Sequence, residues 1–444
     1  MKRTQLVTTI TLVLILTIGF VLLMPFVVSM NACASTINEF PVPTPGSYPI
    51  GISRGPDGNV WFTEADGNKI GKITTSGLIT EYSIPTPASD PVAIIPGPDG
   101  ALWFTEADGN KIGRITTSGT ITEYPVPTTN SFPDGITAGP DGALWFTEAN
   151  SNKIGKITTS GFITETTVPA SGSSPIDIIA GPDGALWFTE YGSNKIGRVT
   201  TSGSFTEFTI PTSDSCPSAI DITAGPDGNI WFAEYRGNNV GKITPSGLIT
   251  EYSIPTPNCQ VWGVAAGPDG NVWFTENNSN KIAKVTPSGS ITEYPVPASG
   301  SGPWNIAAGP DGAIWFTERD SNMIGRIQPV TSSTFYFAEG TCRPGFDPYF
   351  CIQNPGSTDA TVKITYMLGN GSNVTQDVNV PKNSRVTVTA RDKLGTGDDP
   401  AHDFSSKVEC TNGQSIIAER PMYFNYKPGT NNWTGGHDVV GFTE

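Results

Sequence analysis

The sequence predicts an all-β protein in which a seven-bladed β-propeller is followed by an immunoglobulin-like β-sandwich. Three observations support this prediction. A string that begins G-P-D-G recurs along most of the chain, and it stops near residue 328. Beyond that point apolar and polar residues alternate in short runs. Glycine and proline supply 50 and 38 of the 444 residues, whereas charged residues make up only 15%. This composition is typical of short strands joined by tight turns.

The G-P-D-G strings recur at a nearly constant period. They begin at Gly55, Gly97, Gly139, Gly181, Gly225, Gly267 and Gly309. The spacing is 42 residues, except for 44 between the fourth and fifth strings. A fixed period of this size indicates a repeat architecture.

Each period contains four candidate strands. In the second period they are P-V-A-I-I-P, A-L-W-F-T-E-A, K-I-G-R-I-T-T-S-G and T-I-T-E-Y-P-V-P, all rich in β-branched and aromatic residues. G-P-D-G, A-D-G-N and T-S-G separate them as turns. Four antiparallel strands repeated radially make a propeller, in which the tryptophan of each W-F pair is the natural packing residue between blades.

The two ends of the repeat predict how the ring closes. The seventh period keeps its first three strands and then loses the pattern. The missing fourth strand appears at the other end, because T-I-N-E-F-P-V-P-T-P (36–45) matches L-I-T-E-Y-S-I-P-T-P (78–87). The N-terminal strand is therefore expected to complete the last blade, which would remove an open sheet edge.

Residues 1–34 have the pattern of an export signal. Lys2 and Arg3 precede an apolar run to about Met30, and Ala32-Cys33-Ala34 has the form of a cleavage site. An uncut membrane anchor and lipidation at Cys33 are the alternatives. Each of these predicts an extracellular or cell-surface protein that meets a membrane only through this segment.

The remaining chain divides into a propeller (36–328), a linker (329–333) and a sandwich (334–444). The motifs F-Y-F-A-E-G and I-I-A-E-R-P-M-Y-F-N-Y…G-G-H-D-V-V-G of the sandwich resemble a module of unknown function that recurs at the C-termini of bacterial surface proteins. The resemblance implies display or attachment. We expect His437, in G-G-H-D-V-V-G, to be structural.

The blades resemble those of the streptogramin B lyases, the virginiamycin B lyase family. The motif is G-P-D-G-A-L-W-F-T-E…N-K-I-G-R-I-T, followed by I-T-E-Y and I-P-T-P, and it covers about 36–328. The resemblance implies a magnesium-assisted lyase that opens a cyclic depsipeptide at an ester-type C–O bond. It places the site at the channel mouth, with histidines at the inner-strand starts of the last two blades, one carboxylate before the last proline and another after the last W-F.

This chain departs from that pattern at its main catalytic positions. The inner-strand starts are Ile50, Val92, Asp134, Ile176, Ile220, Trp262 and Trp304. Trp262 and Trp304 stand where the resemblance places histidines, and Gly302 stands in place of a carboxylate. Glu318 is present, but Arg319 beside it would repel a metal. The two histidines, His402 and His437, both lie outside the propeller, so a usual general base is missing. We therefore expect no cofactor, and Mg only if the protein is a lyase.

Aromatic residues at the same rim are the first ligand-binding candidates. Paired Trp262 and Trp304 would either stack on a sugar or an apolar cyclic ligand, or plug the channel as packing. Tyr191 and Tyr235 follow W-F-T-E and W-F-A-E and add rim aromatics. Asp134 is interpreted as a solvated loop residue, although it also remains a candidate ligand contact.

A glutamate follows each W-F pair. These residues are Glu64, Glu106, Glu148, Glu190, Glu234, Glu276 and Glu318. They are either a ring of metal or cation ligands or partners of the lysine five residues on, as in Glu64 and Lys69. Asn239 and Met323 replace that lysine in two blades, so Glu234 and Glu318 are the better candidates for a metal or ligand, with Arg236 and Arg319 as substitute partners.

Cysteines agree with export. Cys216 and Cys259 lie in equivalent loops of neighbouring blades, which predicts a disulfide beside Trp262. Two of Cys342, Cys351 and Cys410 are expected to pair as well.

The net charge of −15, with no Lys/Arg cluster beyond the first three residues, argues against nucleic acid as a partner. It fits a cationic ligand or a soluble extracellular life. We consider three functions for an expected monomer. The first is non-catalytic binding of a small molecule, glycan or surface protein at the rim; the others are a Mg-dependent lyase and a structural envelope protein.

Overall fold

The structure, a computed structural model, describes residues 37–213, 221–329, 334–342, 344, 346–354, 359–411, 416–426, 433–440 and 442–443. The proposed export signal therefore lies outside the described residues. No helix within these ranges is long and apolar enough to cross a membrane.

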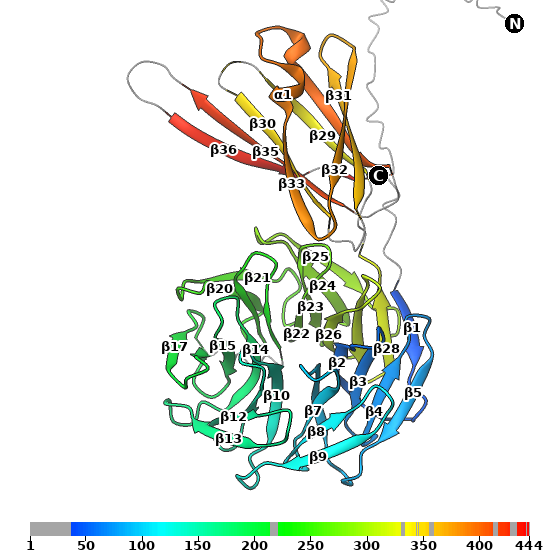
Figure 1. Ribbon diagram of the computed structural model, residues 1–444, viewed down its shortest axis with the longest axis vertical. Coiled ribbons are helices and arrows are strands. Elements are labelled where there is room, and N and C mark those ends of the chain that lie inside the picture. The colour runs from blue at the N-terminus through cyan, green and yellow to red at the C-terminus, as the bar shows by residue number, and fades with distance from the viewer. Residues whose placement is uncertain are drawn as a thin grey trace, which may run out of the picture.

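Seven four-stranded antiparallel sheets form the propeller, and their strand order confirms the predicted blades. The inner strands, which lie nearest the centre of the ring in Figure 1, are β2 (Pro49–Arg54), β6 (Pro91–Pro96), β10 (Pro133–Ala138), β14 (Pro175–Ala180), β18 (Ile222–Ala224), β22 (Val261–Ala266) and β26 (Pro303–Ala308). The second strands are β3 (Val60–Glu64), β7 (Leu102–Glu106), β11 (Leu144–Glu148), β15 (Leu186–Glu190), β19 (Ile230–Glu234), β23 (Val272–Glu276) and β27 (Ile314–Glu318).

The third strands are β4 (Lys69–Ile73), β8 (Lys111–Ile115), β12 (Lys153–Ile157), β16 (Lys195–Val199), β20 (Asn239–Ile243), β24 (Lys281–Val285) and β28 (Met323–Ile327). The outer strands are β5 (Ile79–Ser83), β9 (Ile121–Pro125), β13 (Ile163–Thr167), β17 (Phe205–Thr209), β21 (Ile249–Ser253), β25 (Ile291–Pro295) and β1 (Ile37–Pro41). β1 pairs with β28, with Ile37 opposite Ile327, so the predicted closure of the last blade by the N-terminal strand is confirmed.

The W-F pair holds each blade to its neighbour. Trp61 is fully buried, stacks on Tyr82 at 5.7 Å between ring centroids and donates its Nε1–H to Asp57 of G-P-D-G at 3.0 Å. The aspartate that sets the turn therefore also accepts the hydrogen bond of the buried indole. Gly55 must be glycine here, because a Cβ would lie 2.4 Å from the Trp61 ring. Every blade but the third repeats the aromatic stack; in that blade Thr166 occupies the position of Tyr82.

A threonine of the second strand joins neighbouring inner strands around the channel. Thr63 Oγ1 accepts from the Gly51 amide and donates to the Val92 carbonyl of the next blade, both at 2.8 Å. Thr317 closes the circle by donating to the Ile50 carbonyl at 2.8 Å. These bonds bring the inner strands so close that a Cβ on Gly51 would lie 2.2 Å from the Val92 carbonyl.

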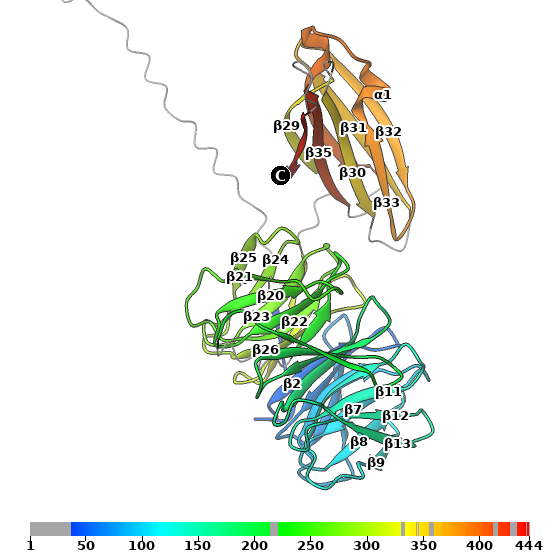
Figure 2. The same cartoon turned by 90° about the vertical axis from the view of Figure 1, so that its left-hand side faces the viewer.

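The C-terminal part forms two sheets, which confirms the predicted sandwich. One sheet has the order β32-β31-β34-β29-β37 and the other β33-β30-β35-β36. Their strands run in similar directions in Figure 2, and one core cluster draws residues from both sheets. The strands are β29 (Thr334–Thr341), β30 (Phe346–Asn354), β31 (Ala360–Leu368), β32 (Asn373–Val380), β33 (Ser384–Thr389), β34 (Asp403–Cys410), β35 (Ile417–Tyr426), β36 (Trp433–Val440) and β37 (Phe442–Thr443), with the helical turns α1 (Ala390–Leu394) and η1 (Pro400–His402).

The disulfide that we predicted for the sandwich is not found among its described residues. Cys342, Cys351 and Cys410 are all buried, and the structure does not join any two of them. His402 instead belongs to a local contact, since its Nδ1 lies 3.0 Å from the Asp399 carboxylate. The side chain of His437 lies outside the described part of the chain.

Candidate functional site

The candidate site is the channel mouth where inner strands begin and second strands end. Antiparallel pairing places Pro303 of β26 opposite Glu318 of β27, and the same pairing recurs at Pro133 and Glu148. The register of each full inner strand then shifts before the fourth residue, so the second and third residues leave the regular ladder. Side chains at these two positions, such as Trp304 and Asn305, are therefore the ones that reach the channel.

One side of the mouth carries a continuous aromatic stack. The rings of Trp262 and Trp304 lie 3.8 Å apart at 23°, and Tyr235 meets Trp262 edge-on at 5.0 Å. The Arg319 guanidinium covers the other face of this group, 4.0 Å from the Trp304 centroid and 4.8 Å from that of Tyr48. These five residues, which we call the aromatic half of the mouth, span blades five, six, seven and one.

The two tryptophans of the aromatic half stack on each other. They are partly buried and face one another, so they do not form an open clamp in which a ring is held between two indoles. The surfaces left for a ligand are the exposed edges of the two rings and the face of Trp304 that Arg319 covers. The buried Trp262 Nε1–H has no hydrogen-bond partner among the described residues. Tyr191 does not join the stack; its side chain is 40% exposed.

The other side of the mouth carries three aspartates from blades three, four and five. Burial and, as a smaller cause, the charge of Asp90 raise the pKa of Asp134 to about 7. Burial and, as a smaller cause, the charge of the Asp221 carboxylate raise the pKa of Asp177 well above its ordinary value. Burial likewise raises the pKa of Asp221 to about 8. We call Asp134, Asp177 and Asp221 the acidic half of the mouth.

Two of these aspartates lie where neighbouring blades meet. Asp177 Oδ2 accepts from the Ile222 amide of blade five at 2.8 Å. The Val264 amide of blade six and the Asn305 side chain lie close enough to Asp221 to favour its charged form. Blade five has Ala233 in place of the bridging threonine. Asp221 is therefore the polar side chain next to blade six where a threonine hydroxyl is missing.

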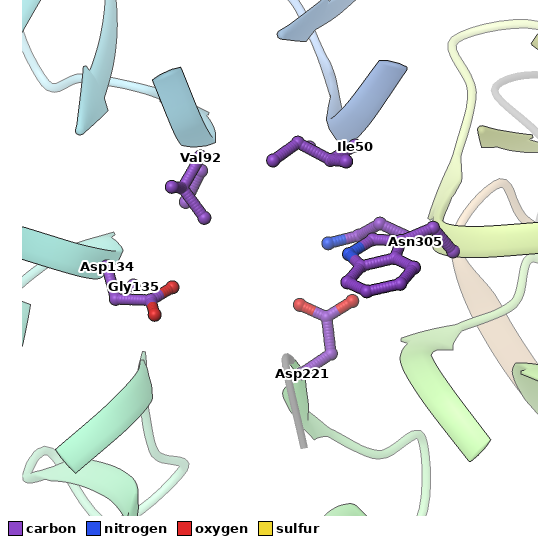
Figure 3. Close-up of a pocket in the computed structure, with 9 residues that line it drawn as sticks. Ile50, Val92, Asp134, Gly135, Asp221 and Asn305 are labelled. Carbon is purple, nitrogen blue, oxygen red and sulfur yellow. The ribbon is translucent and has the colours of Figure 1, made fainter. Parts of the chain in front are cut away.

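A small cavity separates the two halves. It is lined by Ile50, Gly51, Val92, Ala93, Asp134, Gly135, Asp221, Trp304 and Asn305. Figure 3 shows the Asp134 and Asp221 carboxylates turned toward its centre, with Ile50 and Val92 on the opposite side. Its solvent space is about 20 Å³, which has room for a water or a small ionic group and not for an organic ring.

Sequence reasoning missed Asp177, Asp221 and Asn305, and it misread Asp134. Asp134 is not a solvated loop residue, because it lines the channel cavity. The missed signal is the third residue of each inner strand. This residue is Gly51, Ala93, Gly135 and Gly263 in four blades, but Asp177, Asp221 and Asn305 in the others.

The predicted ion pairs of the glutamate ring are wrong. Glu64 does face Lys69 across the hairpin, but Lys69 Nζ binds Glu81 of the outer strand at 2.9 Å and also contacts Thr44. The same choice recurs in Lys111–Glu123, Lys153–Glu165, Lys195–Glu207 and Lys281–Glu293. Glu64 remains fully buried, with neither carboxylate oxygen hydrogen-bonded in the described structure. Burial, followed by the Glu81 charge, raises the pKa of Glu64 to about 7.

Glu234 and Glu318 do not stand apart from this ring. Both are fully buried. Glu234 accepts from Asn239 at 3.2 Å, and Glu318 from the Ser321 hydroxyl at 3.0 Å. Arg319 does not replace the missing lysine, since it pairs with Asp320 at 2.9 Å while lying over Trp304.

A magnesium ion does not fit the positions to which the resemblance assigns it. Two indoles replace the histidines there, and a guanidinium lies beside the remaining glutamate. Burial and, after it, the charge of Glu39 raise the pKa of Glu318 to about 7. No group of three or more His, Cys, Asp or Glu in the described ranges is placed to hold a metal.

The predicted disulfide at the rim is not seen. Cys259 is a fully buried free thiol, and burial raises its pKa to about 12. Cys216 lies outside the described residues. The pairing of the two cysteines stays a prediction.

Comparisons with known proteins agree with the blade motif. The sequence profile of the virginiamycin B lyase family matches residues 28–224 and 218–340. A streptogramin B lyase structure shares 41% identity and a TM-score of 0.64, covering 66% of this chain and 98% of that chain. Virginiamycin B lyase from Staphylococcus aureus shares 44% identity and the same TM-score over 66% of this chain and 99% of that one. A catalytically inactive histidine-to-alanine variant of that lyase, with quinupristin, shares 43% identity, also with a TM-score of 0.64 over 66% and 99%.

Proposed function

Because the chain belongs to the virginiamycin B lyase family, we propose a function that keeps the family's propeller and departs from its chemistry. The protein is an exported, non-catalytic binding propeller. It takes a ligand with a sugar ring or an apolar cyclic body at the channel mouth. The observation that carries this proposal is the stacked pair Trp262 and Trp304, which stands where the resemblance expects catalytic histidines.

The absence of a histidine base in the propeller argues against the lyase chemistry of the family. An elimination needs a group near the mouth that removes a proton at the working pH. No histidine occurs anywhere in the propeller sequence. The buried glutamates at the rim have carboxyl oxygens without donors, and their pKa values lie near 7 or 8. They are enclosed behind the hairpin turns, where a ligand at the mouth does not reach them.

The aromatic half offers one face to a ligand ring, the face of Trp304 that Arg319 covers. The ion pair of Arg319 with Asp320 is exposed at the aspartate, so it contributes little to holding the guanidinium in place. A ligand ring that displaces Arg319 gains a stacking contact on an indole already fixed from behind by Trp262.

Lyase activity is the second candidate function, favoured by the 41–44% identity to lyases. A reaction with quinupristin distinguishes lyase activity from non-catalytic binding. The purified secreted chain is incubated with quinupristin with and without Mg²⁺ and EDTA, and mass spectrometry follows linearisation. We expect intact quinupristin in each condition. Turnover that EDTA abolishes would establish the lyase instead.

Binding is measured separately, with a glycan panel and a set of apolar cyclic peptides. Trp304→Ala is expected to weaken binding about tenfold or more, as loss of a central aromatic contact does. Tyr191→Ala, an exposed aromatic residue at the same rim, is the matched control and should bind like the wild type. Binding to no member of either set, or equal binding by both variants, would leave a structural envelope role as the better account.

The export signal and the sandwich support the cellular side of the proposal. Lys2 and Arg3 before the apolar run favour passage out of the cytoplasm. The sandwich then serves to display the propeller at the cell surface. The protein acts as a monomer. Cell fractionation with and without 334–444 tests this role: loss of surface retention in the truncated chain supports it, and unchanged retention contradicts it.

A further inference from the structure

The two halves of the mouth differ in charge. The aromatic half, which comprises Tyr48, Tyr235, Trp262, Trp304 and Arg319, includes a guanidinium, whereas the acidic half has no positively charged neighbour among the described residues. No lysine, arginine or histidine lines the cavity, and none is among the groups that set the pKa of Asp134, Asp177 or Asp221. The carboxylates therefore face a channel that lacks a counter-charge in the described structure.

Two of the carboxylates have free acceptor capacity that points into this cavity. The Asp134 side chain makes no hydrogen bond within the described ranges, and it lines the cavity. The Oδ2 atom of Asp221 is buried and has no partner there, although Asp221 also lines the cavity. Buried polar atoms are usually satisfied, so the buried Asp221 Oδ2 indicates a missing donor, and the half-buried Asp134 carboxyl lines the same small space.

The size and walls of the cavity restrict what that donor is. A directly coordinated metal is disfavoured, because no three His, Cys, Asp or Glu side chains of the described residues are placed to hold one, the three aspartates included. A guanidinium is too large for a space of about 20 Å³. An ammonium group is compact and carries three donors. Ile50 and Val92 provide an apolar wall for an alkyl stem (Figure 3). Trp304 also lines the cavity, and its ring provides a π surface for the cation.

We propose that the acidic half of the mouth binds a primary ammonium group on an unbranched alkyl chain. The ammonium donates to Asp134 and to Asp221 Oδ2, while the stem runs past Ile50, Val92 and Trp304 toward the rim. The source is either a free alkyl diamine or the lysine side chain of a partner protein. This inference rests on the proposed function in one respect, since it supplies the charged end of the ligand whose ring lies on the aromatic half.

Calorimetric titration of the full secreted chain tests the ammonium subsite directly. Pentylamine is the probe, and pentanol is its neutral match. We expect pentylamine to bind about tenfold or more tightly than pentanol, as charge-assisted hydrogen bonds in a partly buried site allow. Equal affinities for the amine and the alcohol would overturn the proposal without the need for any variant.

Variants locate the site. Asp134→Asn keeps the shape and removes one charge, and we expect it to weaken pentylamine about tenfold. Asp108→Asn changes the same charge at an exposed turn of blade two on the same face, and it should bind pentylamine like the wild type. An Asp134→Asn protein that keeps full amine affinity refutes the assignment, provided its melting temperature matches that of the wild type.

Two further arms separate sources and proposals. Tighter binding of cadaverine than of Nα-acetyl-lysine methylamide indicates a free diamine, and the reverse indicates a lysine side chain. A neutral ring compound that binds through Trp304 should bind Asp134→Asn and the wild type alike. A wild-type protein that binds ring compounds but no amine therefore refutes the ammonium subsite, whereas one that binds amines but no ring compound refutes the proposed platform.

Discussion

The substitution Glu106→Gln tests whether the buried glutamate ring is protonated at neutral pH. Glu106 is fully buried, and neither of its carboxyl oxygens has a hydrogen-bond partner in the described structure. Burial, followed by the Glu123 carboxylate, raises the pKa of Glu106 from 4.5 to about 8. A glutamine keeps the size of the side chain and removes the titration.

The sign follows from the raised pKa. In the unfolded chain the carboxyl loses its proton near pH 4.5, whereas in the folded chain it keeps the proton until about pH 8. The folded state therefore binds more protons between these two values, and the free energy of unfolding falls as the pH rises through that window. Each pH unit contributes about 1.4 kcal/mol per group, so a rise from pH 5 to pH 8 lowers stability by roughly 4 kcal/mol at most.

Guanidinium denaturation between pH 5 and pH 9 measures this slope by tryptophan fluorescence, which reports the propeller because every tryptophan except Trp433 lies there. Glu106→Gln should flatten the decline by roughly 2–4 kcal/mol over the window. Asp108→Asn, an exposed change in the same hairpin, should leave the slope unchanged. If Glu106→Gln and the wild type lose stability in parallel, Glu106 is ionised in the folded protein and the reasoning is wrong.

Three other substitutions test the contacts around the channel. Gly51→Ala should destabilise the propeller by about 1–3 kcal/mol in chemical denaturation, because its Cβ would press on the Val92 carbonyl; a neutral result would show that the inner strands can separate. Thr105→Ala should cost about 1–3 kcal/mol, since the Asp134 carbonyl that accepts from Thr105 at 2.6 Å loses its donor. Arg319→Ala should raise the affinity for a ring ligand by uncovering Trp304, and a lower affinity in direct titration would mean that the guanidinium itself binds the ligand.

The propeller was predictable because the same short contacts recur in every blade. One period of sequence specifies a strand register, a turn and a buried tryptophan, and repetition then fixes the ring. Closure was also visible, since 36–45 carried the strand that the seventh period lacked. Strand β32 has a weaker sequence signal, because its outward face is polar and two of its three valines, Val374 and Val378, are only partly buried.

The lysine partners were not predictable from pairing alone. Lys69 has a glutamate on each side, Glu64 on the second strand and Glu81 on the outer strand. Sequence spacing favours the hairpin partner, but the long side chain reaches the partly exposed outer strand. An ion pair there retains hydration, whereas one at Glu64 would require burying both charges. Burial decided the partner, and burial depends on how the blades stack.

The two halves of the mouth differ because they are made of residues at which the blade repeat is broken. A residue that recurs in every blade is occupied by a contact that also recurs, as the bridging threonines and buried glutamates show. A site with two different ends therefore requires positions where the repeat is broken. Blade five illustrates this: it has Ala233 in place of the bridging threonine, and it carries Asp221, whose carboxyl lies near the Val264 amide of blade six and has one buried oxygen without a partner in the described structure. The breaks in the repeat thus keep the ring closed while placing acids on one side of the mouth and indoles on the other, which is the arrangement that a ligand with a charged end and a ring-shaped body would need.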